Sequence, residues 1–342
     1  MTTIRYPWET PPENGEMVEI AKSVFWLRLP LPMKLDHVNV YVLDDGDGWT
    51  IIDTGMKSRK VQGMWQHLLD GPLRGKPVKR VVATHHHPDH IGLHGWFVEE
   101  FGAEYVSTQV AYLTARMLTL DVQDSYTTGQ IDFYRRAGMR ADLLAARETD
   151  RPFNFSDVVH PIPVGFTRIE EGDVIEMGGR TWDIRVDHGH APDHASFWSI
   201  DDNLVLSGDQ VIASISSNIG VYPTEPDANP LADWMRSCTR LQEFANCEHL
   251  ALPGHKLPFI GMPLRLKQLL ENHHGALDRL RIDLQISKTA GEVMLAVFKR
   301  NIGDGEYSLG LVEALAHCNY LWHAGEVTRT LDYDGAYRWQ MK

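Results

Sequence analysis

The segment VVATHHHPDHIGLHGW, residues 81–96, places five histidines and one aspartate directly after a short apolar run. The apolar run predicts a buried strand, and GLHGWFVEEFG, residues 92–102, predicts a helix after it. Ligands of α/β folds commonly lie at the carboxyl ends of strands. A solvated, histidine-rich turn is the simplest interpretation, but neutral imidazole is also the commonest metal ligand in proteins. The segment therefore predicts a metal site, provided that other parts of the chain supply further ligands.

The spacing within this segment suits two metal ions. His85 and His87 alternate along a strand end and can point in one direction. Asp89 and His90 follow on the turn and can face a second point. Two-metal hydrolytic sites hold their ions about 3.5–4 Å apart, a distance that one such segment can serve. Four residues cannot complete two sites of four or more ligands each, so the hypothesis requires distant partners.

Three further segments supply such partners. IRVDHGH ends at His190, LVLSGD at Asp209 and LALPGH at His255, and each begins with a strand-like pattern. A glycine precedes each of the three residues and allows a backbone turn that aims the next side chain into a shared space. The hypothesis therefore predicts seven converging ligands: His85, His87, Asp89, His90, His190, Asp209 and His255.

Outside these motifs, strand and helix patterns alternate along the chain. Residues 18–56 predict paired strands, residues 57–70 a helix, and residues 75–84 a loop followed by a buried strand. This order predicts an α/β fold with helices over a sheet. Residues 107–150 are helix-prone with a break near DSYTTG, and they predict a helical insertion between strands. Such an insertion can cover an active site. The alternative is an insertion that has only a structural role.

The C-terminal part of the chain has a different pattern. From about residue 263 helical patterns predominate, and TRTLDYDGAYRWQM predicts a β-hairpin near the end. Helices followed by a two-stranded ribbon suggest a small winged-helix-like appendage. The sequence therefore predicts a catalytic domain over residues 1–262 and a helical, winged-helix-like domain over residues 263–342.

The composition limits the partners and the location that we expect. The chain has 342 residues, of which 43% are hydrophobic, so it can bury a large core. A formal net charge of −13 disfavours nucleic acid as a partner, because phosphate binding is driven by Lys and Arg. Three cysteines without CxxC spacing indicate neither a disulfide framework nor a thiolate metal site. With no signal peptide and no apolar run of about 20 residues, we expect a cytoplasmic protein without a membrane partner.

Taken in order, the motifs resemble those of the metallo-β-lactamase superfamily of metal-dependent hydrolases. The resemblance covers about residues 20–260 and rests on IIDTG, THHHPDH, HGHAPDH, LSGD and LPGH. Several spaced motifs in one order are specific, whereas each of them alone is weak. The resemblance implies the αββα sandwich of that superfamily, here with the helical insertion and the C-terminal appendage.

The resemblance also implies a cofactor of two divalent metal ions. It distributes the seven ligands as follows: His85, His87 and His190 on a first metal, Asp89, His90 and His255 on a second, and Asp209 bridging both. A hydroxide between the metals would be the nucleophile, because the cations lower its pKa toward neutrality. Histidine and aspartate ligands suit zinc, with iron and manganese as alternatives.

Three residues receive supporting roles from the same resemblance. Asp53, in IIDTG, would orient metal ligands through hydrogen bonds. His194, in HGHAPDH, would make a structural hydrogen bond instead of binding metal. Asp89 would act in catalysis as well, by orienting the hydroxide.

The ligand set narrows the reaction that the resemblance implies. True β-lactamases of the superfamily typically lack a histidine after the motif aspartate, and many have a cysteine where this chain has Asp209. Here His90 and Asp209 are both present, which looks like the dinuclear site of glyoxalase II and ribonuclease Z. The leading expectation is hydrolysis of a small acylated substrate such as a thioester. The alternative with the same site is an RNA or nucleotide phosphodiesterase.

Two other classes of function remain as alternatives. A mononuclear iron oxygenase needs only two histidines and one aspartate, so seven ligands disfavour it. A non-catalytic DNA-binding regulator would leave the metal ligands without a purpose. For the hydrolase, Tyr126 and Tyr134 in the insertion are candidate substrate contacts, and the polar segment 216–230 is a candidate pocket wall. The C-terminal part is expected to pack on the catalytic domain or on a second subunit, and a homodimer is the expected oligomer.

Overall fold

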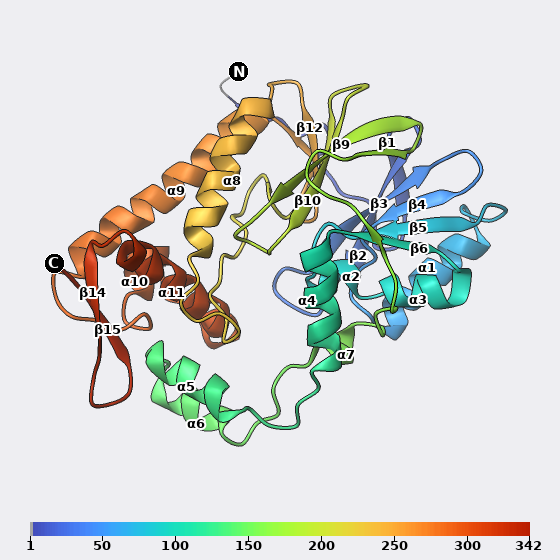
Figure 1. Cartoon of the computed structure of the whole chain (residues 1–342). Coiled ribbons are helices and arrows are strands. Elements are labelled where there is room, and N and C mark those ends of the chain that lie inside the picture. Colours follow the sequence, from blue (N-terminus) through green and yellow to red (C-terminus); the bar gives the residue numbers. More distant parts are fainter. Residues whose placement is uncertain (1–2) are drawn as a thin grey trace.

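The computed structural model describes residues 3–342 and consists of two β-sheets that face each other between two groups of helices (Figure 1). The first sheet has seven strands: β1 (Met17–Ala21), β2 (Val24–Pro30), β3 (His37–Asp44), β4 (Trp49–Ile52), β5 (Val78–Val82), β6 (Glu104–Ser107) and β7 (Thr167–Arg168). The second sheet has six strands, in the order β13 (Phe259–Ile260), β12 (Leu250–Pro253), β11 (Leu204–Gly208), β10 (His194–Ser199), β9 (Arg180–Asp187) and β8 (Val174–Met177). A separate hairpin joins β14 (Val327–Leu331) to β15 (Tyr337–Met341).

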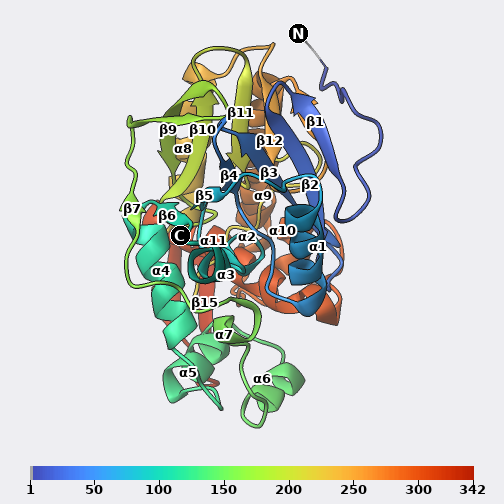
Figure 2. The same cartoon turned by 90° about the vertical axis from the view of Figure 1, so that its right-hand side faces the viewer.

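Helices connect and cover the sheets. Those of the first half of the chain are α1 (Arg59–Asp70), α2 (Pro88–Ile91), α3 (His94–Phe101), α4 (Gln109–Leu120), α5 (Thr128–Arg136), α6 (Ala141–Arg147) and α7 (Phe155–Val158). Those of the second half are α8 (Pro230–Phe244), α9 (Met262–Asp283), α10 (Met294–Phe298) and α11 (Tyr307–His323), with a 3₁₀ turn η1 (Asp304–Glu306) before α11. In Figures 1 and 2, α1 and α3 lie beside the first sheet, and α8 and α9 lie beside the second.

The first sheet changes from antiparallel to parallel at β4. Strands β1 to β4 pair antiparallel, and β4, β5, β6 and β7 then pair parallel. Parallel neighbours need a crossover, and α1 and α3 supply the crossovers on either side of β5. The carboxyl end of β5 therefore lies at an interior position of the sheet, where the histidine-rich segment begins.

Three apolar clusters hold the layers together, because each sheet is buried on both faces. Between the sheets, Trp26 of β2 packs in one cluster with Trp182 of β9 and Phe197 of β10. The outer face of the first sheet forms a second cluster with side chains of α1 and α3, including Trp65. The order is helices, sheet, sheet, helices, and it confirms the predicted α/β fold with helices over sheets.

The third cluster joins the second sheet to the C-terminal helices. Val205 of β11 lies in one cluster with Trp234 of α8, Leu266 of α9 and Leu311 of α11. Within residues 3–342, the C-terminal helices thus share a core with the second sheet. The domain boundary at residue 262, and the winged-helix character of residues 263–342, stay predictions.

Residues 107–150 contain the three helices α4, α5 and α6, with a break at residues 121–127 that includes the first four residues of DSYTTG. In Figure 1, α5 and α6 extend from the end of α4 toward α11. Across residues 3–342, none of the helices combines the length and the apolar character that crossing a bilayer requires.

Candidate metal centre

The histidine-rich segment lies where β5 ends and α2 begins. Pro88 occupies the first turn of α2, where its missing N–H costs no helical hydrogen bond. The chain therefore leaves the strand, presents His85 and His87, and turns into a short helix that carries Asp89 and His90. His85 Nε2 and His87 Nδ1 lie 2.9 Å apart, so the two rings point to one place, as their alternation predicts.

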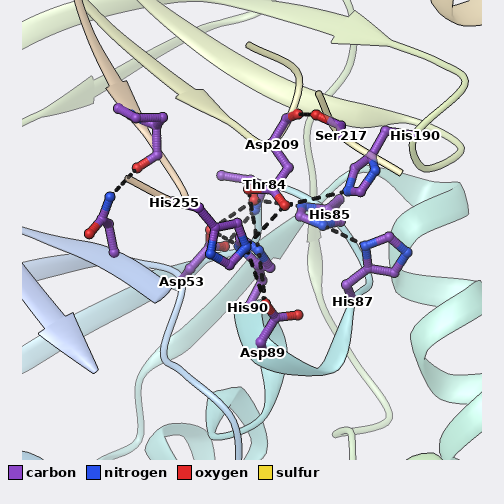
Figure 3. A network of polar contacts seen from close by, with 12 residues as sticks. Asp53, Thr84, His85, His87, Asp89, His90, His190, Asp209, Ser217 and His255 are labelled. Atoms are coloured by element: carbon purple, nitrogen blue, oxygen red, sulfur yellow. Dashed lines mark hydrogen bonds and ion pairs between the residues drawn. The ribbon is translucent and has the colours of Figure 1, made fainter. Parts of the chain in front are cut away.

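Three strand ends of the second sheet bring the distant residues to the same place (Figure 3). His190 follows β9, Asp209 follows β11, and His255 follows β12. Asp209 Oδ2 lies 3.5 Å from His190 Nε2 and 3.2 Å from His255 Nε2. His255 Nε2 also lies 3.3 Å from Oδ2 of Asp89. The site therefore forms between the two sheets, from segments that span 170 residues of the chain, from His85 to His255.

The seven side chains fall into three overlapping groups that are able to hold a cation. Within each group the ligand atoms lie within 4.8 Å of one another, in the sets His85, His87 and His190; His85, His90 and Asp209; and Asp89, His90 and His255. The structure thus brings together all seven residues that the sequence singles out. His87 and Asp89 are partly exposed and the other five are buried, so the site opens to solvent on the side of these two residues.

Hydrogen bonds from the outer ring nitrogens fix four of the histidines. The pairs are His85 Nδ1 with Thr84 Oγ1 at 3.0 Å, His90 Nδ1 with Asp53 Oδ2 at 2.7 Å, His190 Nδ1 with the Asn218 carbonyl at 2.8 Å, and His255 Nδ1 with the His37 carbonyl at 2.7 Å. When such a ring is neutral, the N–H donated outward leaves Nε2 with its lone pair facing the site, which is the arrangement that metal-binding histidines use.

Asp53 and His194 lie against the site without facing its centre. The Asp53 carboxylate accepts hydrogen bonds from the backbone N–H and the hydroxyl of Thr84, at 2.9 and 2.8 Å, as well as from His90. His194 Nε2 accepts a hydrogen bond from the Asp209 backbone N–H at 3.0 Å. Both positions suit the orienting roles that the family resemblance implies.

Unpartnered polar atoms show that a divalent cation fits this cluster. Nε2 of His90, Nε2 of His190 and Oδ1 of Asp209 are buried without a hydrogen-bond partner. Buried polar atoms are normally paired, and leaving one unpaired costs about 1–3 kcal/mol. All three atoms are good ligands for zinc, iron or manganese and point into one space. The donor set therefore matches the chemistry of a metal centre.

The pKa values of the cluster shift in different directions in its two parts. Burial and the surrounding imidazoles hold the pKa values of His85 and His87 well below the usual value, so these rings are neutral and able to bind a metal. Burial alone would lower the pKa of His255, but the carboxylates of Asp209 and Asp89 outweigh it and raise that pKa to about 10. Burial opposes ionisation of Asp209, yet His255 and His90 hold its pKa well below the usual range.

Two of the three glycines that precede ligands have the turning role predicted for them. Gly189 has a φ of 110° and Gly208 a φ of 48°, a region that glycine adopts readily. Gly254 has an ordinary φ, so its role comes from the absence of a side chain. A Cβ on Gly254 would lie 2.3 Å from Asp209 Oδ1. The third glycine is therefore needed for close approach to the ligands.

Tyr126 and Tyr134 lie together in the α5–α6 region. The Arg147 guanidinium stacks on both rings and hydrogen-bonds the Tyr126 hydroxyl, and burial raises the pKa of Tyr134. Tyr134 is also close enough to Tyr222, in the segment after Asp209, to influence its pKa electrostatically. Contact of these tyrosines with a substrate stays a prediction.

Sequence reasoning missed the partners whose hydrogen bonds to the site involve a backbone carbonyl. The carbonyls of His37 and Asn218 orient His255 and His190, and the Ser217 hydroxyl donates to the Asp209 carbonyl. Every residue has a carbonyl, so no residue type marks such a partner. For His37, the one sequence signal of proximity to the site was its place on an early predicted strand.

Comparisons with known proteins agree with this geometry. Residues 33–247 match the metallo-beta-lactamase superfamily, and residues 277–342 match the metallo-beta-lactamase-like C-terminal domain. The probable metallo-hydrolase YqjP of Bacillus subtilis (strain 168) is 24% identical over 306 residues, which cover 88% of this chain and 92% of that protein.

Two crystal structures are also similar. A beta-lactamase domain protein from Burkholderia ambifaria has a TM-score of 0.89 and 34% identity, covering 99% of this chain and 97% of its own. A metallo-beta-lactamase family protein from Thermus thermophilus has a TM-score of 0.79 and 27% identity, covering 95% and 100%.

Proposed function

Because this chain belongs to the metallo-beta-lactamase superfamily and is a metal-dependent hydrolase, we propose that it hydrolyses a small acylated substrate, with a thioester as the leading candidate. One observation carries the proposal. The Asp209 carboxylate lies between two histidine groups, 3.5 Å from His190 Nε2 on one side and 3.2 Å from His255 Nε2 on the other. A carboxylate in that position can serve two metals at once.

The seven residues would hold two metal ions in the distribution that the family resemblance implies. One metal would take His85, His87 and His190, the other would take the remaining histidines and Asp89, and Asp209 would bind both. When bound, such a pair lowers the pKa of water and polarises the substrate oxygen. We propose zinc for both positions, because imidazole and carboxylate ligands suit it.

The residues around the cluster would orient water and substrate. Asp89 is the exposed carboxylate of the set, with 17% of its side chain accessible, so it can accept a hydrogen bond from a water that enters the site. His87 lies beside this opening. A substrate would therefore approach on the side of His87 and Asp89, while the buried ligands exclude bulk water from the opposite side.

The surroundings favour a small acylated substrate over a nucleic acid. The net charge of −13 would repel a polyanion, whereas an uncharged thioester carbonyl meets no such barrier. The insertion that carries Tyr126 and Tyr134 lies near Tyr222 of the segment after Asp209, so both segments are candidate walls of the substrate site. These features support hydrolysis of a compact substrate.

The metal assignment predicts that metal binding releases protons. In the metal-free protein His255 has a pKa of about 10 against its usual 6.5. Its pairing with the carboxylates therefore stabilises the fold fully below pH 6.5, and that stability is lost as the pH rises through about 10. A metal accepts only the neutral imidazole, so binding at pH 8 should release protons and tighten as the pH rises. Calorimetric titration with Zn²⁺ in buffers of different ionisation enthalpy measures the release, and a heat independent of the buffer would contradict the assignment.

The substrate proposal is tested by comparing ester classes on one preparation. Zinc-loaded protein should cleave an acyl thioester with a kcat/KM about tenfold or more above that for a lactone or a phosphodiester. The acid released by each substrate, followed with a pH indicator, gives the comparison, and release of the free thiol, followed with a thiol-reactive dye, confirms cleavage of the thioester. Protein stripped by a chelator is the control. Preferred cleavage of a dinucleotide or of RNA would replace the thioester proposal with a phosphodiesterase.

A further inference from the structure

The loop of residues 216–229, here called the site loop, connects Asp209 to α8 and lies against two of the predicted ligands. The Ser217 hydroxyl donates a hydrogen bond to the Asp209 carbonyl. The Asn218 carbonyl accepts the hydrogen bond from His190 Nδ1 at 2.8 Å. The orientation of the His190 ring therefore depends on the orientation of one peptide group in the site loop.

The opposite side of the same loop is bound to α11. The Asn218 side-chain amide donates to the Glu313 carboxylate at 2.7 Å and to the Leu309 carbonyl at 3.3 Å. The Val221 N–H donates to the Val312 carbonyl at 3.1 Å. Residue Asn218 thus contacts the metal centre through its backbone and the C-terminal helix through its side chain.

Glu313 is an unusual residue for its surroundings. It is buried on a helix whose other buried residues are mainly apolar, and burial raises its pKa to about 7. A buried carboxyl group is costly unless it is hydrogen-bonded. The Asn218 amide donates to it, and the backbone N–H of Ile219, the next residue of the site loop, is near enough to favour its charged form. The carboxyl group therefore holds the two residues that surround the carbonyl facing His190.

We propose that Glu313 is a positioning residue of the metal centre, which acts through Asn218 on the ring of His190. By fixing the side chain of Asn218 and attracting the N–H of Ile219, it restrains the peptide between these two residues. The carbonyl then stays on His190 Nδ1, and Nε2 stays an available ligand. The inference rests on the proposed role of His190 in binding metal. It gives the C-terminal helix α11 a part in metal affinity.

The test compares metal affinities of variants of the full-length protein. Replacing Glu313 by leucine keeps the volume and removes both acceptors, so one of the two Zn²⁺ ions should bind about tenfold or more weaker. The other ion should keep its wild-type affinity. Glu313→Gln keeps an acceptor oxygen at the same place and should lose less affinity than Glu313→Leu. Competition with a chromophoric chelator measures both affinities without any substrate.

Asn319→Ala is the matched control on the same helix. Asn319 is buried on α11, and its amide donates to the carbonyls of Pro226 and Ala228, at the far end of the site loop from Asn218. Its loss should lower the melting temperature but leave both metal affinities unchanged. Equal weakening by Asn319→Ala and Glu313→Leu would mean that α11 only stabilises the loop, and it would overturn the proposal.

A second variant keeps the test decisive if Glu313→Leu does not fold. Asn218→Ala removes the amide that meets Glu313 but retains the carbonyl that meets His190, and it should weaken the same Zn²⁺ ion. Wild-type affinity in a folded Glu313→Leu or Asn218→Ala protein would overturn the positioning role. The readout also separates this inference from the proposed function, because a wild-type protein that binds two metals but cleaves no thioester would refute only the function.

Discussion

Replacing Asp209 with alanine should lower kcat/KM by about 10³-fold or more and leave the protein with one metal ion or none. Asp209 is the only predicted ligand whose carboxylate lies within 3.6 Å of ring nitrogens of His90, His190 and His255. Metal catalysis contributes several kcal/mol to such reactions, and about 1.4 kcal/mol corresponds to a factor of ten. Without Asp209, the charges of both metals would lose their shared counter-ion. Elemental analysis and a thioester assay on the same preparation measure the two effects.

Asp187→Asn is a suitable control for this variant. Asp187 is also a buried aspartate of the second sheet, but its carboxylate accepts a hydrogen bond from Arg240 at 2.9 Å and lies outside the three ligand groups. We expect it to keep both metals and most of the activity. Retention of two metals and wild-type turnover by Asp209→Ala would refute the bridging role.

Replacing Gly254 with alanine should have an effect of similar size with the smallest possible change in side chain. The added Cβ would lie 2.3 Å from Asp209 Oδ1 and 2.7 Å from His90 Cε1, distances that non-bonded atoms do not adopt. Either Asp209 and His90 move or the loop that carries His255 moves, and each outcome breaks up the ligand set. We expect loss of at least one metal and a fall in kcat/KM of about 10³-fold.

The matched control is the same substitution at Gly63. This glycine lies on the exposed face of α1, and an added Cβ would meet no atom within 4 Å. Because alanine is a better helix former than glycine, Gly63→Ala should stabilise the protein by up to about 1 kcal/mol and leave metal content unchanged. A Gly254→Ala protein with two metals and wild-type activity would contradict the prediction. It would mean that Asp209 and His90 can move away from the added Cβ without loss of metal binding.

The sequence predicted a large part of the fold because the relevant signals are local. The strand patterns over residues 18–56 correspond to the paired strands β1 to β4, and the break predicted near DSYTTG corresponds to residues 121–127 between α4 and α5. The resemblance to the metallo-β-lactamase superfamily, read from five short motifs, is confirmed. The C-terminal helices share a core with α8 and the second sheet, which agrees with the expectation that this part packs on the catalytic domain or on a second subunit. The sequence pattern did not show which residues make that core, because the packing joins residues far apart in the chain.

The predicted site followed from residue chemistry in the same way. Histidine and aspartate are recognisable ligands wherever they occur, so strand-end positions such as His190 and Asp209 could be selected without any coordinates. Their convergence was a hypothesis until the tertiary structure placed all seven within the three ligand groups. Their roles on two metals stay a proposal that the Asp209 and Gly254 variants test.

The sequence by itself determined which side chains are able to bind metal and in what order they occur, since these properties belong to each residue and its neighbours. Beyond Asp53 and His194, which the family motifs indicated, only the tertiary structure decided which groups orient those side chains. The carbonyls of His37 and Asn218 and the carboxylate of Glu313 reach the site across 218, 28 and 95 residues of chain, counted to His255, His190 and Asn218. A peptide carbonyl is the same in every residue, so its role comes from where folding places it.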